Sequence, residues 1–432
     1  MTIRHVSIDF EKGDPAEQCL VPAHARRLDY HCHAAASRQP RLQGRLALEP
    51  DVDLADYTMQ AVIDWIELGF VTADRHQSLN IGGHINKTLA KAGWREVSHV
   101  HGVERKDGYL GQVFLVRVND PTPEKIRRVC SAIQSFCRLR RRADGRRFVI
   151  TGIEVAVDIR PALKDPEPEE RVRARWRMSE LLRKHLAVRP GFLSTDRDLP
   201  RVTFEDAQAR RTKKILEPRK EMPGQAPQSL DLRLRLASQA HGKHVKPPLD
   251  GTFYVGADDA PVMLRLQDKT ADSHGAARGR VLLADADRRS RIEVRAWLPR
   301  PDEAGLLLSG GLKEICGEET GWRCPLETLE DLRDVTFEAL RKPFFDFAIP
   351  TVPAVEGTKG LEPDQGQWDV FSRSGVFGLD LYQRRLEKRD LGRKGYGQAF
   401  QQLNERMRQA LVHLSGSWHG VDLGEACERR AA

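Results

Sequence analysis

The chain has 432 residues and a formal net charge of +8, with 40% hydrophobic and 31% charged residues. The length indicates two or three domains, or one large domain with tails, and the composition is typical of a folded protein. No apolar run approaches the ~20 residues that span a bilayer, and the start, MTIRHVSIDFEKGD, lacks the apolar core of a signal peptide. We therefore expect a cytoplasmic protein with no membrane partner.

Residues 1–50 are polar and irregular, which predicts a flexible N-terminal arm. The hydrophobic periodicity that follows predicts strand, helix, two strands, helix, strand, helix and then three short strands. These elements are expected at residues 57–71, 81–92, 94–101, 109–118, 123–138, 148–159, 169–187, 251–256, 262–269 and 291–298. The order predicts an α+β domain over residues 51–300, with a mostly antiparallel sheet and helices on one face.

After Pro299 the pattern becomes mainly helical. Residues 301–432 therefore predict a largely helical, basic C-terminal region. A stretch near 353–370, PAVEGTKGLEPDQGQWDV, is rich in glycine and proline and predicts a linker within it.

Basic residues gather in short stretches of the chain. One contains Arg140, Arg141 and Arg142, a second contains Arg210 and Arg211, and a third lies within 384–394. Such clusters bind nucleic acid because neutralising phosphates releases counterions. A single cluster is equally consistent with a solvated surface, but three clusters in one chain favour a polyanionic partner.

The run FVITGIEVAVDI, at 148–159, is the clearest strand in the sequence. Because side chains alternate across a strand, Glu154, Ala156 and Asp158 share the face opposite the apolar residues. Two carboxylates beside a small residue can bind a divalent cation through oxygen. The alternative is a half-exposed sheet with solvated acids.

Two later runs, VMLRLQDK and RIEVRAWL, place further charged residues on one strand face. If these strands pair, one side of the sheet carries a dense set of polar groups that could hold a metal and a phosphodiester together. The set is Arg265, Gln267, Lys269, Arg291, Glu293 and Arg295. Opposite charges that face each other on a sheet can also be purely structural.

The blocks AVIDWIELGF, FVITGIEVAVDI, GTFYVG-x5-VMLRLQDK and RIEVR occur in this order over about residues 57–300. Together they resemble the rolling-circle replication initiation factors of plasmids and filamentous phages, and related relaxases of conjugative elements. The resemblance implies origin recognition and a metal-assisted transesterification. In that reaction a tyrosine attacks the scissile phosphate and becomes joined to the 5′ side of the nick.

Carried over by position, the resemblance implies that Asp158 and Glu293 bind Mg²⁺ or Mn²⁺, with Glu154 and Asp64 as further ligands. Basic side chains of the same blocks would contact phosphate. These are Arg265, Lys269 and Arg291.

The sequence departs from the family where the nucleophile is expected, because the tyrosine of that block is replaced by Gln267. Glutamine cannot form the covalent link. Either another tyrosine has taken over, Tyr254 being the closest in sequence, or the domain binds DNA without cutting it. Tyr254 also has a simpler interpretation as a packing residue.

The leading hypothesis is thus a DNA-binding replication initiator or relaxase-like protein that nicks one strand. The alternatives are a catalytically inactive DNA-binding protein of the same fold and an unrelated basic α+β protein. A host helicase and a second copy of the chain are expected partners, and the C-terminal region is the candidate to bind them.

A second metal hypothesis concerns His99-Val100-His101, in which both imidazoles face the same side of a strand. Such a triplet with a catalytic tyrosine is the arrangement of another nickase superfamily. The triplet lies beside a polar turn at 102–108, so coincidence also explains it.

Overall fold

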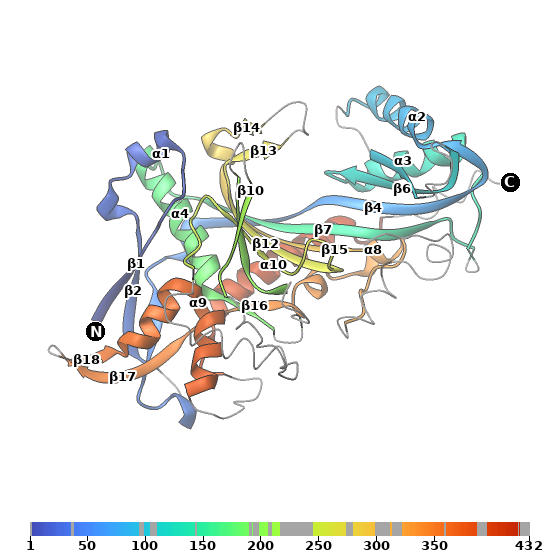
Figure 1. Cartoon of the computed structure of the whole chain (residues 1–432). Helices are drawn as coiled ribbons and strands as arrows, with labels where there is room; N and C mark the ends of the chain where they lie inside the picture. Colours follow the sequence, from blue (N-terminus) through green and yellow to red (C-terminus); the bar gives the residue numbers. More distant parts are fainter. Residues whose placement is uncertain are drawn as a thin grey trace, which may run out of the picture.

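The computed structural model describes residues 2–35, 39–94, 99–103, 110–142, 145–189, 192, 198–205, 210–216, 245–273, 280–298, 312, 322–357, 360–386, 395–421 and 423. Its centre is a nine-stranded sheet in which every neighbouring pair is antiparallel (Figure 1). In spatial order the strands are β10 (Arg210–Lys214), β9 (Arg201–Glu205), β11 (Thr252–Val255), β12 (Val262–Lys269), β15 (Arg289–Trp297), β7 (Phe148–Pro161), β4 (Tyr57–Gln77), β6 (Leu110–Asn119) and β5 (His99–Gly102). The predicted α+β class with a mostly antiparallel sheet is confirmed.

Strands β4 and β7 form a long ribbon that crosses the molecule (Figure 1). Strand β4 runs six residues beyond its predicted end at Val71, because His76 and Gln77 still pair with β6. The register of β4 against β7 shifts at Asp64 and again after Glu67. Such irregularities add local twist, as expected for a ribbon of this length.

Four helices pack on one face of this sheet: α2 (Ser78–Lys91), α3 (Pro123–Phe136), α4 (Pro168–His185) and α10 (Gln401–Trp418). Alternation directs the apolar residues of β7 and β15 to this face, where they form the main core. Helix α3 begins as its sequence predicts, since the Thr122 hydroxyl accepts a hydrogen bond from the Lys125 N–H and Pro123 occupies the first turn.

Helix α9 (Gln365–Leu386) lies against α4 and bends sharply at Gly375. This glycine has φ 67° and ψ −162°, a conformation that side-chain-bearing residues rarely adopt. A Cβ built at Gly375 would lie 2.8 Å from the Lys184 carbonyl oxygen. The bend therefore lets two helices approach at the level of their backbones. Among the described residues, no helix is long and apolar enough to cross a membrane.

The N-terminal segment is not a flexible arm, which corrects the prediction for residues 1–50. Strands β1 (Thr2–Ser7), β2 (Arg27–Ala34) and β3 (Arg45–Pro50) form a second sheet with β17 (Thr351–Gly357) and β18 (Gly360–Pro363). The stretch predicted as a linker near 353–370 is thus strand and helix. The sequence of β1 is mostly polar, so it did not predict a strand. Strand β3 pairs with β2 and with β17, and β17 lies about 300 residues away in the sequence.

Among its described residues, the C-terminal region is largely helical, as predicted, but it also contains strands that were not predicted. It contributes β16 (Phe345–Ile349) and β19 (Gln398–Ala399), which form a small sheet with β8 (Leu186–Val188). Two short strands, β13 (Ala271–Ser273) and β14 (Arg280–Leu282), form a separate hairpin. Shorter helices are α1 (Pro15–Leu20) and α8 (Asp331–Asp334), with 3₁₀ turns at Ala23–Ala25, Pro40–Leu42, Leu54–Asp56, Asp285–Asp287 and Phe337–Leu340.

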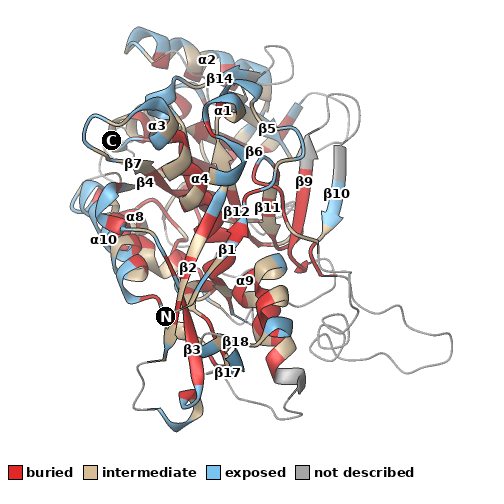
Figure 2. Cartoon of the chain, turned by 90° about the vertical axis from the view of Figure 1, so that its left-hand side faces the viewer, coloured by how far each residue is buried: buried red, intermediate tan, exposed pale blue. Residues whose placement is uncertain are grey.

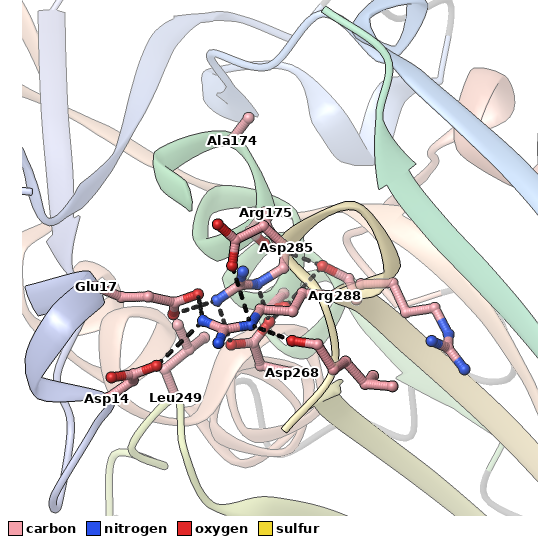
Figure 3. Close-up of polar contacts among 12 residues, drawn as sticks. Asp14, Glu17, Ala174, Arg175, Leu249, Asp268, Asp285 and Arg288 are labelled. Carbon is pink, nitrogen blue, oxygen red and sulfur yellow. Dashed lines mark hydrogen bonds and ion pairs between the residues drawn. The ribbon is translucent and has the colours of Figure 1, made fainter. Parts of the chain in front are cut away.

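A buried ionic network fastens the N-terminal segment to the central sheet (Figure 3). Arg175 of α4 pairs with Glu17 of α1, and its Nε lies 2.8 Å from Asp268 Oδ1 on β12. Arg288 joins the network through Glu17 and, at 3.1 Å, through Asp14. In Figure 2 the buried residues run from the central sheet into β2 and β3, so both sheets belong to one packed structure.

Candidate nucleic-acid and metal site on the sheet face

The polar side chains of the central strands meet on one face of the sheet, which we call the polar face. It is the side opposite α4 and α10. Strands β12 and β15 are paired, and their register sets Arg265 beside Glu293. In the neighbouring row, Arg291 of β15 lies between Gln267 and Asp158.

Three carboxylates from three adjacent strands converge near the centre of the polar face. One oxygen each of Asp64, Glu154 and Glu293 lies within 4.8 Å of the other two. Glu154 and Glu293 point inward because of strand alternation. Asp64 joins them at the register shift between β4 and β7. We call these three residues the acidic cluster.

Arginines and an amide surround the acidic cluster. Arg265 pairs with Glu293, and its Nη2 lies 3.4 Å from Glu154 Oε1. Arg291 Nη1 lies 2.6 Å from Asp64 Oδ2. Gln267 Nε2 donates a hydrogen bond of 3.0 Å to Glu293 Oε1. These contacts compensate buried negative charge, since Glu154 and Glu293 are only 7% and 1% exposed.

The pKa values of the cluster reflect burial and crowding of like charges. Burial raises the pKa of Asp64 to about 6, although Arg291 opposes the shift. Burial and then the charge of Glu293 raise the pKa of Glu154 to about 7. Burial would also raise the pKa of Glu293, but the guanidinium groups of Arg265 and Arg291 outweigh it and hold that pKa below its ordinary value.

The donor set of the acidic cluster fits a hard divalent cation. It offers only carboxylate oxygens, which suit Mg²⁺ or Mn²⁺ better than a soft metal. Raised pKa values in Asp64 and Glu154 are a sign of negative charge that a cation would neutralise. Asp64, Glu154 and Glu293 are therefore the residues that would hold the predicted metal.

Asp158, one of the two foremost metal candidates in the sequence, lies outside the acidic cluster. Its carboxylate pairs with Arg291, with Arg289 at 2.9 Å and with Arg160 at 3.4 Å. Burial alone would raise the pKa of Asp158, but hydrogen bonding and ion pairing with Arg291 lower it. Arg291 is 2% exposed and spans Asp158, Asp64 and Glu293, so little of its surface is left for the predicted phosphate contact.

Tyr254 lies on the polar face on β11, two strands beyond β15 and the acidic cluster, with β12 between them. It is opposite Arg265 on β12 and opposite Arg201 on β9, whose guanidinium lies 4.9 Å from the ring centre. Tyr30, Tyr57 and Tyr396 are buried elsewhere in the structure, and Tyr382 lies on α9. Among the tyrosines that the structure describes, Tyr254 is therefore the one beside the site.

The remaining predicted residues of this face have partners on the protein. Lys269 Nζ lies 2.9 Å from Asp272 Oδ1. Arg295 donates to the Asp258 carbonyl and lies over the ring of Trp297, with 5.2 Å to the ring centre. Both side chains are only partly exposed.

Sequence reasoning missed a second group on the polar face, near the β6 side. The guanidinium of Arg117 lies 4.1 Å from the ring centre of Trp65 and 3.0 Å from Glu67. Trp297 Nε1 also donates to Glu67, at 3.2 Å. The alternation that pointed to Glu293 continues to Trp297, and that of β4 continues to Trp65 and Glu67, so the signal was present.

The basic clusters of the sequence have different surroundings. Arg140 and Arg141 are exposed, whereas Arg142 is buried and lies 2.6 Å from Glu327. Arg210 and Arg211 belong to β10, but their side chains lie outside the described residues. Most of the cluster at 384–394 also falls outside them.

His99 and His101 lie on the edge strand β5, with ring centres 4.3 Å apart. They project to the polar face, since His99 pairs with Arg117. Burial and the neighbouring His99 lower the pKa of His101. The two imidazoles are not part of the acidic cluster, so the two candidate metal sites are separate.

No protein family model, curated protein or solved structure matches this chain. The resemblance to replication initiation factors therefore rests on the sequence blocks quoted above.

Proposed function

We propose that this protein is a DNA-binding replication initiator or relaxase-like protein that holds one strand of an origin on its polar face. The observation that carries the proposal is the convergence of Asp64, Glu154 and Glu293, from three adjacent strands, inside a ring of arginines. Such a site can bind a divalent cation and a phosphodiester together. We also propose that the protein acts in the cytoplasm. Its proposed partners, besides DNA, are a host helicase and a second copy of the same chain.

The proposed reaction is a transesterification at phosphorus. The Tyr254 hydroxyl loses its proton and forms a new O–P bond with the scissile phosphate. The bond from phosphorus to the 3′ oxygen breaks, and that oxygen leaves as a hydroxyl after taking up a proton. Asp64, Glu154 and Glu293 would hold a divalent cation, which would compensate the charge that develops on the phosphate.

Neighbouring residues of the chain support this role for Tyr254. Arg265 lies between Tyr254 and Glu293 in one row of the sheet, where it can contact a phosphate that reaches both. On the other side, the Arg201 guanidinium lies 4.9 Å from the centre of the Tyr254 ring and helps to fix its position.

A second candidate function is strand binding without cleavage, and Gln267 favours it. This residue occupies the position where the resembling family has its nucleophile, and it donates to Glu293 inside the acidic cluster. Tyr254 lies one strand farther away. A glutamine at this place stabilises the carboxylate but cannot attack phosphorus.

A nicking assay distinguishes the two candidates. The protein is incubated with origin DNA from its own genetic element and Mg²⁺ or Mn²⁺, and covalent adducts are separated under denaturing conditions. Nicking predicts an adduct that Tyr254→Phe abolishes and Tyr382→Phe, on α9, preserves. Binding without an adduct supports the second candidate, and the absence of any binding to single-stranded or duplex origin DNA rejects both.

A further inference from the structure

Strand β4 contains one extra residue, Asp64, where its side chains change faces. Ile63 and Ile66 both lie in the main core, although an uninterrupted strand would direct them to opposite faces. In the register against β7, Ile63 and Trp65 are opposite adjacent residues, so Asp64 between them has no partner on that strand. This is the pattern of a β-bulge, and it turns both Asp64 and Trp65 toward the polar face.

The direction of the Asp64 side chain depends on this bulge. In a regular strand Asp64 would share a face with Ile66, two residues along, and would point into the core. With the bulge, its carboxylate instead reaches Arg291 and approaches the carboxylates of Glu154 and Glu293. The third member of the acidic cluster is therefore placed by the backbone of β4.

On its other side, the bulge is held by Asp120, which follows the last residue of β6. The register of β4 against β6 pairs Trp65 with Asn119, and the next residue along β6 is Asp120. Its N–H donates a hydrogen bond of 2.8 Å to the Asp64 carbonyl. Because Asp64 has no partner in the register of β7, this bond fixes the backbone of the bulge from the β6 side.

Asp120 has a backbone conformation that residues with side chains seldom adopt. Its φ is 42°, and it precedes Pro121, which restricts its conformation further. The turn from β6 to α3 is anchored beside it, because the buried Lys125 donates a hydrogen bond of 2.6 Å from Nζ to the Asn119 carbonyl. A positive φ costs energy and persists where the surrounding structure imposes it, often beside a functional site.

We propose that Asp120 is a positioning residue, whose positive φ and N–H hold the bulge of β4 that directs the Asp64 carboxylate into the acidic cluster. The inference rests on the proposed function, in which Asp64 would hold a metal, and it adds a residue outside the sequence blocks of the resemblance. Asp120 acts through its backbone. Its exposed carboxylate is not a proposed ligand.

The test measures the Mn²⁺ affinity of the full-length protein by calorimetry at pH 8, for Asp120→Val, Asp120→Gly and Asp120→Asn. Valine strongly disfavours a positive φ, whereas glycine adopts it freely and asparagine tolerates it. Asp165→Val is the matched control. Asp165 is also exposed, has φ 46° and precedes Pro166, but it lies in the turn between β7 and α4. Circular dichroism and thermal unfolding confirm that each variant is folded.

We expect Asp120→Val to bind Mn²⁺ about 10–100-fold more weakly, the usual loss when the support of a metal ligand is removed. Asp120→Gly and Asp120→Asn should bind like the wild type. Asp165→Val should lower the melting temperature about as much as Asp120→Val and leave the Mn²⁺ affinity unchanged. In an Asp64→Asn background, Asp120→Val should cause no further loss, because Asp120 acts through Asp64.

Two outcomes would overturn the positioning role while the metal site stands. Wild-type affinity in Asp120→Val would show that the bulge forms without a positive φ at this position. A loss in Asp120→Gly and Asp120→Asn as large as in Asp120→Val would assign the effect to the carboxylate and not to the backbone. A wild-type protein that binds no Mn²⁺ would instead reject the metal site of the proposed function, and the positioning role with it.

Discussion

At the scale of single residues, the raised pKa of Glu154 shows how its surroundings prepare the candidate site to bind a cation. Its carboxylate is buried beside Glu293, and the attraction of Arg265 does not fully compensate for this. The pKa of Glu154 therefore rises to about 7, so the group is part protonated at neutral pH. An environment that favours protonation of the Glu154 carboxylate also favours binding of a cation beside it. When neither a proton nor a cation is bound, the buried charge lowers the free energy of unfolding.

Replacing Glu154 by Gln should stabilise the metal-free protein at pH 8 by on the order of 1–2 kcal/mol and leave it unchanged at pH 4. Between the ordinary pKa of 4.5 and about 7, the folded state keeps a proton that the unfolded chain releases. Stability therefore falls as the pH rises through this window, and glutamine removes the loss. Denaturant titrations at both pH values measure the effect, with Glu170→Gln on α4 as an exposed control. Equal destabilisation at both pH values would instead mean that the ion pair with Arg265 dominates.

Binding of Mn²⁺ should strengthen by about a hundredfold between pH 5.5 and pH 8. Asp64 and Glu154, with pKa values of about 6 and about 7, must lose their protons before they can ligate the metal. Calorimetry in buffers of different ionisation enthalpy would count the released protons. Glu154→Gln should remove most of the pH dependence, and no Mn²⁺ binding at pH 8 would reject the metal site.

At the scale of elements, local patterns predicted what lies within one strand or helix. The run FVITGIEVAVDI is a strand with Glu154 and Asp158 on one face, and the stretch from Pro123 is an amphipathic helix. Strand β3 was not predicted; it pairs with β2 on one side and on the other with β17, a distant segment that a short window of sequence does not show. The position of Asp64 in the acidic cluster results from a register shift between β4 and β7. Hydrophobic alternation in the sequence does not predict such shifts.

Gly375→Ala should destabilise the protein by about 2–3 kcal/mol. The alanine would have to adopt a positive φ, and its Cβ would lie 2.8 Å from the Lys184 carbonyl oxygen. Gly416→Ala is the matched control, since a Cβ there meets no atom within 4 Å and the residue lies in a regular part of α10. The control should gain about 0.5–1 kcal/mol in free energy of unfolding, measured by urea titration. A gain at both positions would show that the bend in α9 is not tied to α4.

At the scale of the whole molecule, the N-terminal and C-terminal segments of the chain pack against each other. Strand β3 pairs with β17, and Tyr30 of β2 packs against Trp368 and Phe371 of α9. Elsewhere, the buried ion pairs of Arg175 with Glu17 and Asp268 connect the N-terminal segment to the central sheet. The N-terminal segment is thus part of the packed core and not an appendage of the domain that contains the central sheet.

Deleting residues 1–50 should abolish cooperative unfolding. The deletion removes Leu28, Tyr30, Leu46 and Leu48, all 3% exposed or less. At about 1.5–3 kcal/mol for each buried side chain, their loss approaches the ~5–15 kcal/mol that stabilises a typical protein. Thermal unfolding of the truncated chain, with and without the 1–50 peptide added in trans, measures the effect. A truncated protein with the melting temperature of the full chain would restore the interpretation of a flexible arm.

The sequence alone determined the α+β class, the central strands and the face on which their charged residues lie, because alternation and amphipathic spacing are local properties. Only the tertiary structure selected Asp64 over Asp158 as the third carboxylate of the cluster, since ion pairs with Arg289 and Arg160 come from a neighbouring strand and from a position two residues along. It also decided that β1, β2 and β3 pack against the rest of the molecule. Those outcomes depend on strand register and on contacts between distant segments, and neither is encoded within a short stretch of sequence.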